Sequence, residues 1–326
     1  MIRFLIICIF HGGSILSKAH SDGHQDLSMP WWTQWNSSSI IIFSLSLIFL
    51  LYGLGWVRQK KRFPHLKKFS YWQGGVFILA ILTLVTSLLS PVDIYSDFLS
   101  WVHMLQHTLL MMVAAPLFAI ASPSYMSQWS IPAAFWRKWW LWKWWGKKTF
   151  SNFWVKPTQL VVLYGLTLWI WHIPSLYEEA LHTAWVHDLQ HISFFLTSYW
   201  FWMILIDPAR KTPLRPELGL MYLFVTSIHS MVLGVLMALS PTVWYEPYLV
   251  TAPQFGWDPL KDQQVAGLIM WMPAGITYLI AAIILFLKLL FPTFWRLPKH
   301  SEGLRFRKPI AFLGVSKKSP GFSEDS

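Results

Sequence analysis

Seven hydrophobic runs of membrane-spanning length constrain this chain more than any other feature of its sequence. A transmembrane helix needs about 20 mostly apolar residues, and 55% of the 326 residues are hydrophobic while only 13% are charged. The runs cover residues 38–57, 73–90, 101–122, 158–173, 187–206, 219–240 and 264–290. We therefore predict an all-α polytopic membrane bundle of about seven transmembrane helices, with one membrane domain over residues 38–291.

The two ends of the chain carry separate predictions. Residues 1–19 resemble a cleavable signal peptide, because a basic start and a short apolar core precede small residues at a plausible cleavage position. Residues 20–37 would then form a short extracytoplasmic segment. The tail over residues 292–326 is polar and is expected to be a disordered cytoplasmic segment. The only cysteine, Cys8, lies within the predicted signal, so the mature chain would have no thiol for a disulfide or a thiolate metal site.

Basic residues predict the orientation. Of the 24 Lys and Arg residues after residue 19, 23 lie at or after the ends of runs one, three, five and seven, and only Lys261 lies opposite. Because Lys and Arg accumulate in cytoplasmic loops, we predict a bacterial plasma (inner) membrane protein with its amino terminus outside and its carboxyl terminus in the cytoplasm. This bias explains the net charge of +11 without nucleic acid. The Trp- and Lys-rich segment Phe135–Phe150 is predicted to lie on anionic membrane lipid, with partner docking as the alternative.

Five histidines are expected at one depth near the outer face. His103 and His107 open the third run in WVHMLQHTLLMM, and His187 and His191 open the fifth in HDLQHISFF. Residues at i and i+4 share a helix face about 6 Å apart, so each pair directs two imidazoles the same way. His172 closes the fourth run just before a proline. Helical bundles build metal sites from facing side chains, and we interpret these five residues as metal ligands.

Each part of this set also has a purely structural interpretation. A single H-x-x-x-H pair can be an interfacial or hydrogen-bonding pair, and His172 can belong to a belt of aromatic side chains at the membrane surface. It is the combination of two pairs with His172 that favours a metal. His229, in the middle of the sixth run, is interpreted first as a satisfied core histidine, a proton-transfer group or a partner contact.

Copper is the first candidate metal and zinc the second. Imidazole ligands without thiolates suit copper, zinc, iron or nickel, and nearby thioethers from Met104, Met270 and Met272 favour Cu(I). If the signal is cleaved after Ala19, His20 becomes the first residue, and its amine and imidazole can chelate copper with His24 close by. A hydrated terminus is the alternative.

Two polar residues at the start of the seventh run complete the candidate site. Asp262 and Gln263 open DQQVAGLIMWMP. Asp262 either orients a ligand histidine or caps a helix. The sequence contains no Gly-rich phosphate loop, zincin motif or nucleophile elbow. We therefore expect a protein that is not an enzyme.

Four motifs, taken in order, resemble one known family. HMLQHTLLMMVAAPL, WHIPSLYEEALH, HDLQHISFF and DQQVAGLIMWMP resemble the CtaG family of caa3-type cytochrome c oxidase assembly factors, and the resemblance covers about residues 38–290. The resemblance implies a seven-span protein that helps to produce active haem–copper oxidase and has a proposed role in copper supply. The residues that fall within matching motifs are His103, His107, His172, His187, His191, Asp262 and Gln263.

The leading hypothesis is a non-catalytic copper-binding metallochaperone. It would hold copper near the aqueous boundary and deliver it to a cytochrome c oxidase subunit, with membrane lipid as its other partner. Two alternatives stay open at this point. One is a haem-binding membrane electron-transfer protein, and the other is a copper or proton transporter, for which His229 would be the deep ionisable group.

Overall fold

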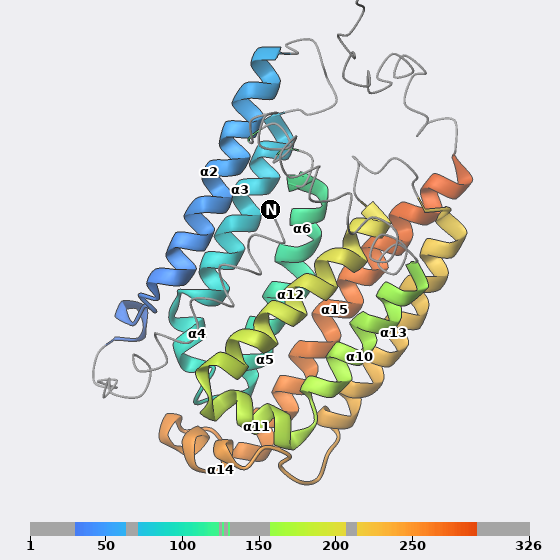
Figure 1. The fold of residues 1–326 in the computed structure, drawn as a ribbon. Coiled ribbons are helices and arrows are strands. Elements are labelled where there is room, and N and C mark those ends of the chain that lie inside the picture. The colour runs from blue at the N-terminus through green and yellow to red at the C-terminus, as the bar shows by residue number, and fades with distance from the viewer. Residues whose placement is uncertain are drawn as a thin grey trace, which may run out of the picture.

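The computed structural model describes residues 30–62, 71–123, 126, 130, 157–206 and 214–291, and all regular structure in these ranges is helical (Figure 1). The predicted signal peptide, His20, His24, the Phe135–Phe150 segment and the tail after residue 291 lie outside the described residues. The elements are η1 (Trp31–Thr33), α2 (Ser39–Arg62), α3 (Tyr71–Leu88), α4 (Pro91–Tyr95), α5 (Ser100–Thr108), the π-helical η2 (Leu109–Ala114), α6 (Ala115–Ala121), α10 (Pro157–Trp171), α11 (Pro174–His182), α12 (Ala184–Ile206), α13 (Pro216–Ala238), α14 (Pro247–Thr251), η3 (Ala252–Phe255) and α15 (Pro259–Leu290).

Six helices in the described ranges are long and apolar enough to cross a membrane by themselves, which confirms the all-α membrane prediction. They are Ser39–Arg62, Tyr71–Tyr95, Ser100–Ala121, Ala184–Ile206, Pro216–Ala238 and Pro259–Leu290. The fourth predicted run differs, because α10 and α11 reach spanning length only together and are bent by 74° at their junction. Pro174 starts α11 and holds the preceding Ile173 in an extended conformation, which breaks the helix.

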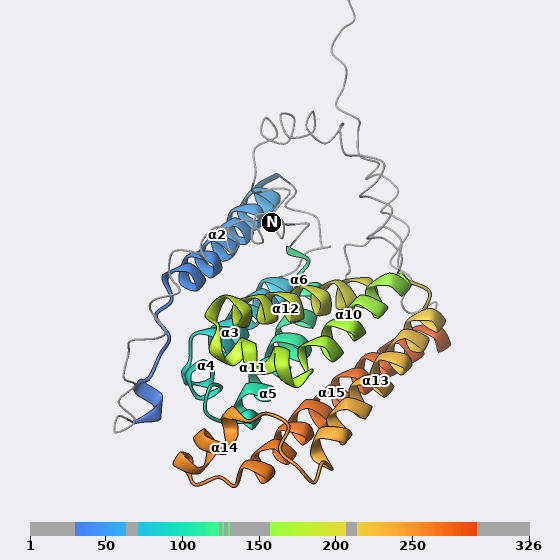
Figure 2. The same cartoon turned by 60° about the horizontal axis from the view of Figure 1, so that its bottom comes forward.

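Short helices close one end of the bundle. α4, α11 and α14 gather at the lower end of Figure 1, and Figure 2 turns this end towards the reader. The hydroxyl of Thr251 in α14 donates to the carbonyl of Phe98, at a distance of 2.8 Å. This contact ties the connection between α13 and α15 to the segment before α5. The first turn of α5 is thereby placed beneath a cover of folded chain, whereas Trp185 in the first turn of α12 is exposed.

Close helix packing brings α13 and α15 together along their length. A Cβ atom added at Gly267 would lie 2.7 Å from the carbonyl oxygen of Gly234 and 2.6 Å from the amide nitrogen of Ala238. Only glycine leaves room for backbones at this distance, as is common between transmembrane helices. This tight pair forms the wall of the bundle from which Asp262, Gln263 and Met270 project.

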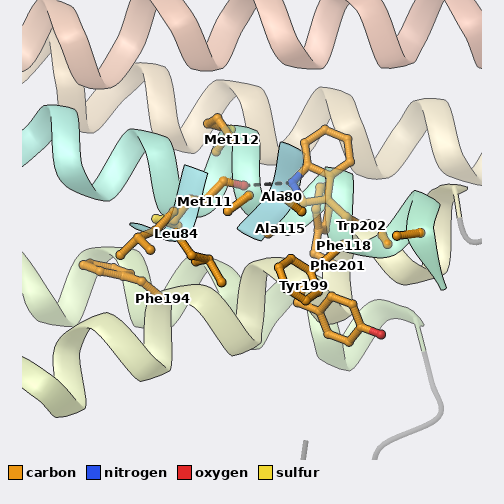
Figure 3. Packing of buried hydrophobic residues seen from close by; sticks show 14 of the residues in the cluster. Ala80, Leu84, Met111, Met112, Ala115, Phe118, Phe194, Tyr199, Phe201 and Trp202 are labelled. Carbon is orange, nitrogen blue, oxygen red and sulfur yellow. Dashed lines mark hydrogen bonds between the residues drawn. The ribbon is translucent and has the colours of Figure 1, made fainter. Parts of the chain in front are cut away.

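A π-helical segment joins α5 to α6 within the third span, one to two turns inward from the histidines. The carbonyl of Met111 in this segment accepts hydrogen bonds from Ser198 Oγ at 2.7 Å and from Trp202 Nε1 at 3.1 Å, both on α12. Figure 3 shows the second of these bonds inside the core, with Phe118, Phe201 and Tyr199 packed near it. Because unpaired polar groups are costly in a membrane, these bonds hold the third and fifth spans side by side.

Candidate metal centre

The two predicted histidine pairs face each other across α5 and α12. Within the pairs, ring centres lie 4.4 Å apart for His103 and His107, and 4.2 Å apart for His187 and His191. Between the helices, His103 lies 5.5 Å from His187, and His107 lies 5.3 Å from His191. Four imidazoles from two helices therefore form one cluster, as the i, i+4 spacing predicted. We call these four residues the histidine cluster.

His172 lies beside the histidine cluster, at the junction of α10 and α11. Phe194 connects them, because its ring centre lies 4.7 Å from that of His107 and 6.1 Å from that of His172. His107 and His172 also line one internal cavity. The structure thus places His172 next to the four clustered imidazoles, on their inner side.

The site is more deeply buried than its predicted position near the aqueous boundary suggested. The exposed fractions are 0% for His103, 4% for His107, 5% for His172 and 7% for His191. Only His187 is half-buried. The histidines were predicted to lie near a membrane boundary, but this position does not bring them into contact with water. Segments outside the predicted spans fold over the histidine cluster.

Three tyrosines form the cover, which we call the tyrosine cover. Tyr177 of α11 stacks on Tyr245 with ring centres 3.8 Å apart, and its own ring lies 4.9 Å from His103. Tyr248 shares a hydrogen bond with the Tyr177 hydroxyl at 3.1 Å and donates to the carbonyl of Ser96, also at 3.1 Å. Tyr245 donates to the carbonyl of His172 at 3.2 Å. Burial raises the pKa of both Tyr245 and Tyr248, so these hydroxyls remain neutral donors.

The buried imidazoles have free nitrogen atoms of the kind that metal ligands require. His172 Nδ1 donates to the carbonyl of Leu168 at 2.7 Å, which leaves a lone pair on Nε2, and this Nε2 has no hydrogen-bond partner. His103 Nδ1 lies 3.4 Å from the carbonyl of Ser96, and its Nε2 has no partner of acceptable geometry although Gln190 is close. Neither nitrogen of His107 has a partner. A backbone carbonyl behind an imidazole is the usual support of a metal-bound histidine.

The spacing of the rings fits one ion, although their orientations do not converge on a point. A metal–nitrogen bond of about 2.0 Å puts each ring centre about 3 Å from the ion, so rings in a tetrahedral site lie about 5 Å apart. Five of the six ring separations in the histidine cluster range from 4.2 to 6.4 Å. Among the described residues, no three His, Cys, Asp or Glu side chains are arranged to hold an ion as they stand. Binding of one ion by the histidine cluster would therefore need a rearrangement of these side chains.

Asp262 has the capping role that was one of its two predicted roles, but the helix that it caps is α5 and not its own helix, α15. Its carboxylate accepts hydrogen bonds from the backbone amides of Ser100 at 2.8 Å and Trp101 at 3.1 Å, so it caps the start of α5 from α15. The cap of α15 itself is Asp258, whose carboxylate accepts from the amide of Lys261. A buried carboxylate at a helix amino terminus satisfies free amides and suits the helix dipole. Asp262 thereby positions the helix that carries His103 and His107.

Gln263 holds the neighbouring segment, Thr242 to Trp244, by two hydrogen bonds. Its side chain donates to the carbonyl of Thr242 at 3.0 Å and accepts from the amide of Trp244 at 2.5 Å. These bonds fix the chain that leads into Tyr245 of the tyrosine cover. Both polar residues of the DQQ motif are therefore placed in the supporting structure of the candidate site rather than among its nitrogen ligands.

Gln106 is a supporting residue that the sequence reasoning missed. It lies between the two histidines of HMLQH, is fully buried, and donates from its amide to the carbonyl of Ser87 at 2.7 Å and to the carboxylate of Asp93 at 2.6 Å. Asp93 also accepts from Asn36 at 2.6 Å. An amide inside an apolar helix was the available signal, because a buried polar side chain needs partners.

The methionines predicted near the site separate into two groups. Met104 and Met270 are buried and line the same cavity as His107 and His172. Met272 is 55% exposed on the outside of α15. Helix residues that are two positions apart do not share a face. Only one of the α15 thioethers, Met270 or Met272, can therefore lie near the histidines.

His229 lies outside this group. Its ring packs against α10, where a Cβ atom added at Gly165 would lie 3.3 Å from His229 Nε2. Its ring centre is 6.2 Å from that of Tyr164. Neither ring nitrogen has a hydrogen-bond partner among the described residues, so these residues give no support to the interpretation as a satisfied core histidine.

Comparison with known proteins agrees with the family resemblance of the four sequence motifs. A family model described as cytochrome c oxidase caa3 assembly factor (Caa3_CtaG) matches residues 50–290. Neither the curated proteins nor the solved structures contain a match to the chain. The matched region holds both histidine pairs, His172 and the DQQ motif, and it covers more than half of the chain. The chain therefore belongs to the family of cytochrome c oxidase caa3 assembly factors.

Proposed function

We propose that this protein is a non-catalytic assembly factor that binds copper at the outer face of the bacterial inner membrane and delivers it to a subunit of a haem–copper oxidase. Family membership supports the assembly role. The observation that carries the copper role is the meeting of two i, i+4 histidine pairs in one cluster. In this cluster His103, His107 and His191 are buried, and each has a ring nitrogen without a hydrogen-bond partner among the described residues. Imidazoles without thiolates would bind copper firmly enough to hold it and release it to a partner.

The orientation and the membrane are part of the same proposal. The last turn of α2, with Lys60, Lys61 and Arg62, and the end of α15 lie at the opposite end of the bundle from α11 and α14. If Lys and Arg mark the cytoplasm, the histidine cluster belongs to the outer side. Copper would then be held on the side on which the N-terminal segment of residues 20–37 is also predicted.

Oxidase maturation in cells tests this function. In a strain without the gene, we compare complementation by the wild-type protein, by the His103→Ala, His107→Ala variant, and by His182→Ala, a control at an exposed histidine of α11. The pair variant should restore less than about a tenth of oxidase activity, since copper-free oxidase is inactive, while His182→Ala should restore all of it. The measurement is oxidase activity and copper per oxidase, with membrane levels of each variant checked by immunoblot. Full copper loading by the pair variant would refute copper delivery through this site.

The haem alternative is disfavoured by the space beside the histidines. The cavity lined by His107 and His172 has room for about one water-sized molecule. A porphyrin is many times larger, and its two axial ligands must lie on opposite faces of the ring. The absorption spectrum of the purified protein distinguishes the two functions, because bound haem gives a Soret band and bound Cu(I) does not.

A further inference from the structure

A small cavity lies beside His107 of the histidine cluster, and methionines form part of its lining. Its walls include four methionines and two histidines, namely Met104, Met111, Met112, Met270, His107 and His172. These residues come from α5, η2, α15 and the end of α10. Thus four of the 12 methionines, from three elements, surround one small space. Methionine also fills irregular gaps in cores, so this grouping indicates a ligand only together with the two histidines.

The nitrogen atoms on this cavity point to a ligand as well. His107 is 4% exposed and neither of its nitrogens has a partner, while His172 is 5% exposed and its Nε2 has none. The hydrogen bond from His172 Nδ1 to Leu168 leaves the lone pair on Nε2. An unsatisfied polar atom in an apolar interior is destabilising. A ligand that binds these nitrogens would remove this cost.

The donor set and the space select one class of ligand. Thioethers are soft ligands that favour Cu(I), whereas Zn(II) and Cu(II) prefer imidazole, thiolate or oxygen ligands. The cavity has room for about one water-sized occupant, which excludes organic cofactors and admits a bare ion. No Asp or Glu that would balance a divalent charge is among the residues that line this cavity. Its titratable lining groups are His107, His172 and Tyr164. A monovalent ion therefore suits it best.

We propose that this cavity is a Cu(I) site, formed by His107, His172 and the thioethers of Met104, Met111 and Met270, that makes the protein selective for Cu(I). The proposal rests on the proposed copper function and specifies the oxidation state of the ion. His107 belongs to both the histidine cluster and the cavity, so it connects the two sites. Copper in the histidine cluster can pass inward without leaving imidazole coordination.

The test replaces sulfur while keeping volume. The variant Met104→Leu, Met111→Leu, Met270→Leu removes three cavity thioethers, and Met→Leu changes in a core usually cost little stability. The matched control Met221→Leu, Met231→Leu, Met272→Leu removes three thioethers that are 48%, 40% and 55% exposed on the outside of the bundle. Cu(I) affinity is measured on full-length purified protein by anaerobic competition with a colorimetric Cu(I) chelator. Zn(II) affinity is measured in parallel.

We expect the cavity variant to bind Cu(I) at least tenfold more weakly with unchanged Zn(II) affinity, while the control binds both metals as the wild-type protein does. Cu(I) affinity within twofold of wild type in the cavity variant would overturn the proposal. If the triple variant aggregates, the single variants Met104→Leu and Met270→Leu replace it, with a threefold loss expected for each. Loss of Cu(I) in the His103→Ala, His107→Ala variant but not in the methionine variant would refute this inference alone. A wild-type protein that binds no copper would refute the proposed function.

Discussion

The two histidine pairs have the same spacing and face each other, yet their surroundings differ. His103 and His107 are almost fully buried, and their helix is held by the Asp262 cap and by Gln106. His187 on α12 is half-buried, and Trp185 next to it in the first turn is 57% exposed. One pair is fixed by contacts from distant parts of the chain, while the other reaches the surface. The same H-x-x-x-H motif can therefore supply a pair held by distant contacts, His103 and His107, and a pair with one partly exposed histidine, His187.

Removal of each pair separately gives the largest expected difference. His103→Ala with His107→Ala should reduce bound copper to less than about a tenth of wild type, because His107 serves both the histidine cluster and the cavity. His187→Ala with His191→Ala should weaken binding but leave one Cu(I), held by the cavity. Copper per chain after anaerobic loading and gel filtration checks this. Equal copper in the two double variants would remove the distinction between the pairs.

Removal of the two aspartate caps gives a smaller effect. Asp262→Ala deletes the acceptor for two backbone amides of α5 and should lower the free energy of unfolding by about 2–3 kcal/mol. Its copper affinity should also fall, because the α5 pair loses its support. Asp258→Ala, the matched control, removes the exposed cap of α15 and should cost about 1 kcal/mol with no change in copper affinity. Thermal unfolding in detergent and copper competition measure both. An identical copper affinity for the two variants would show that Asp262 does not position the site.

Local patterns predicted the helices and the pairs, and tertiary contacts decided the rest. Hydropathy gave seven spans, and the i, i+4 spacing put His103 and His107 on one face. The bend at Pro174 follows from a local rule, and it accounts for the short fourth run. The role of Asp262 could not be read this way, because it caps a helix that begins 162 residues earlier. Its own position suggested a cap for α15, which Asp258 provides instead.

Burial was the least predictable property of the site. Hydropathy places His103 near a membrane boundary but says nothing about Tyr245 and Tyr248, which reach it from the connection between α13 and α15. The π-helical segment has no sequence signal that we recognise. It nevertheless positions the carbonyl of Met111 to accept hydrogen bonds from Ser198 and Trp202. Helix periodicity alone would have separated Met270 from Met272, because residues two apart lie on different faces.

Copper X-ray absorption spectroscopy on the loaded wild-type protein tests the central claim most directly, since it identifies the atoms bound to the metal. The account predicts nitrogen neighbours with the outer-shell scattering of imidazole rings, and loss of this scattering in the His103→Ala, His107→Ala variant. Copper bound only by oxygen, or an imidazole signal that persists unchanged in the double variant, would contradict it.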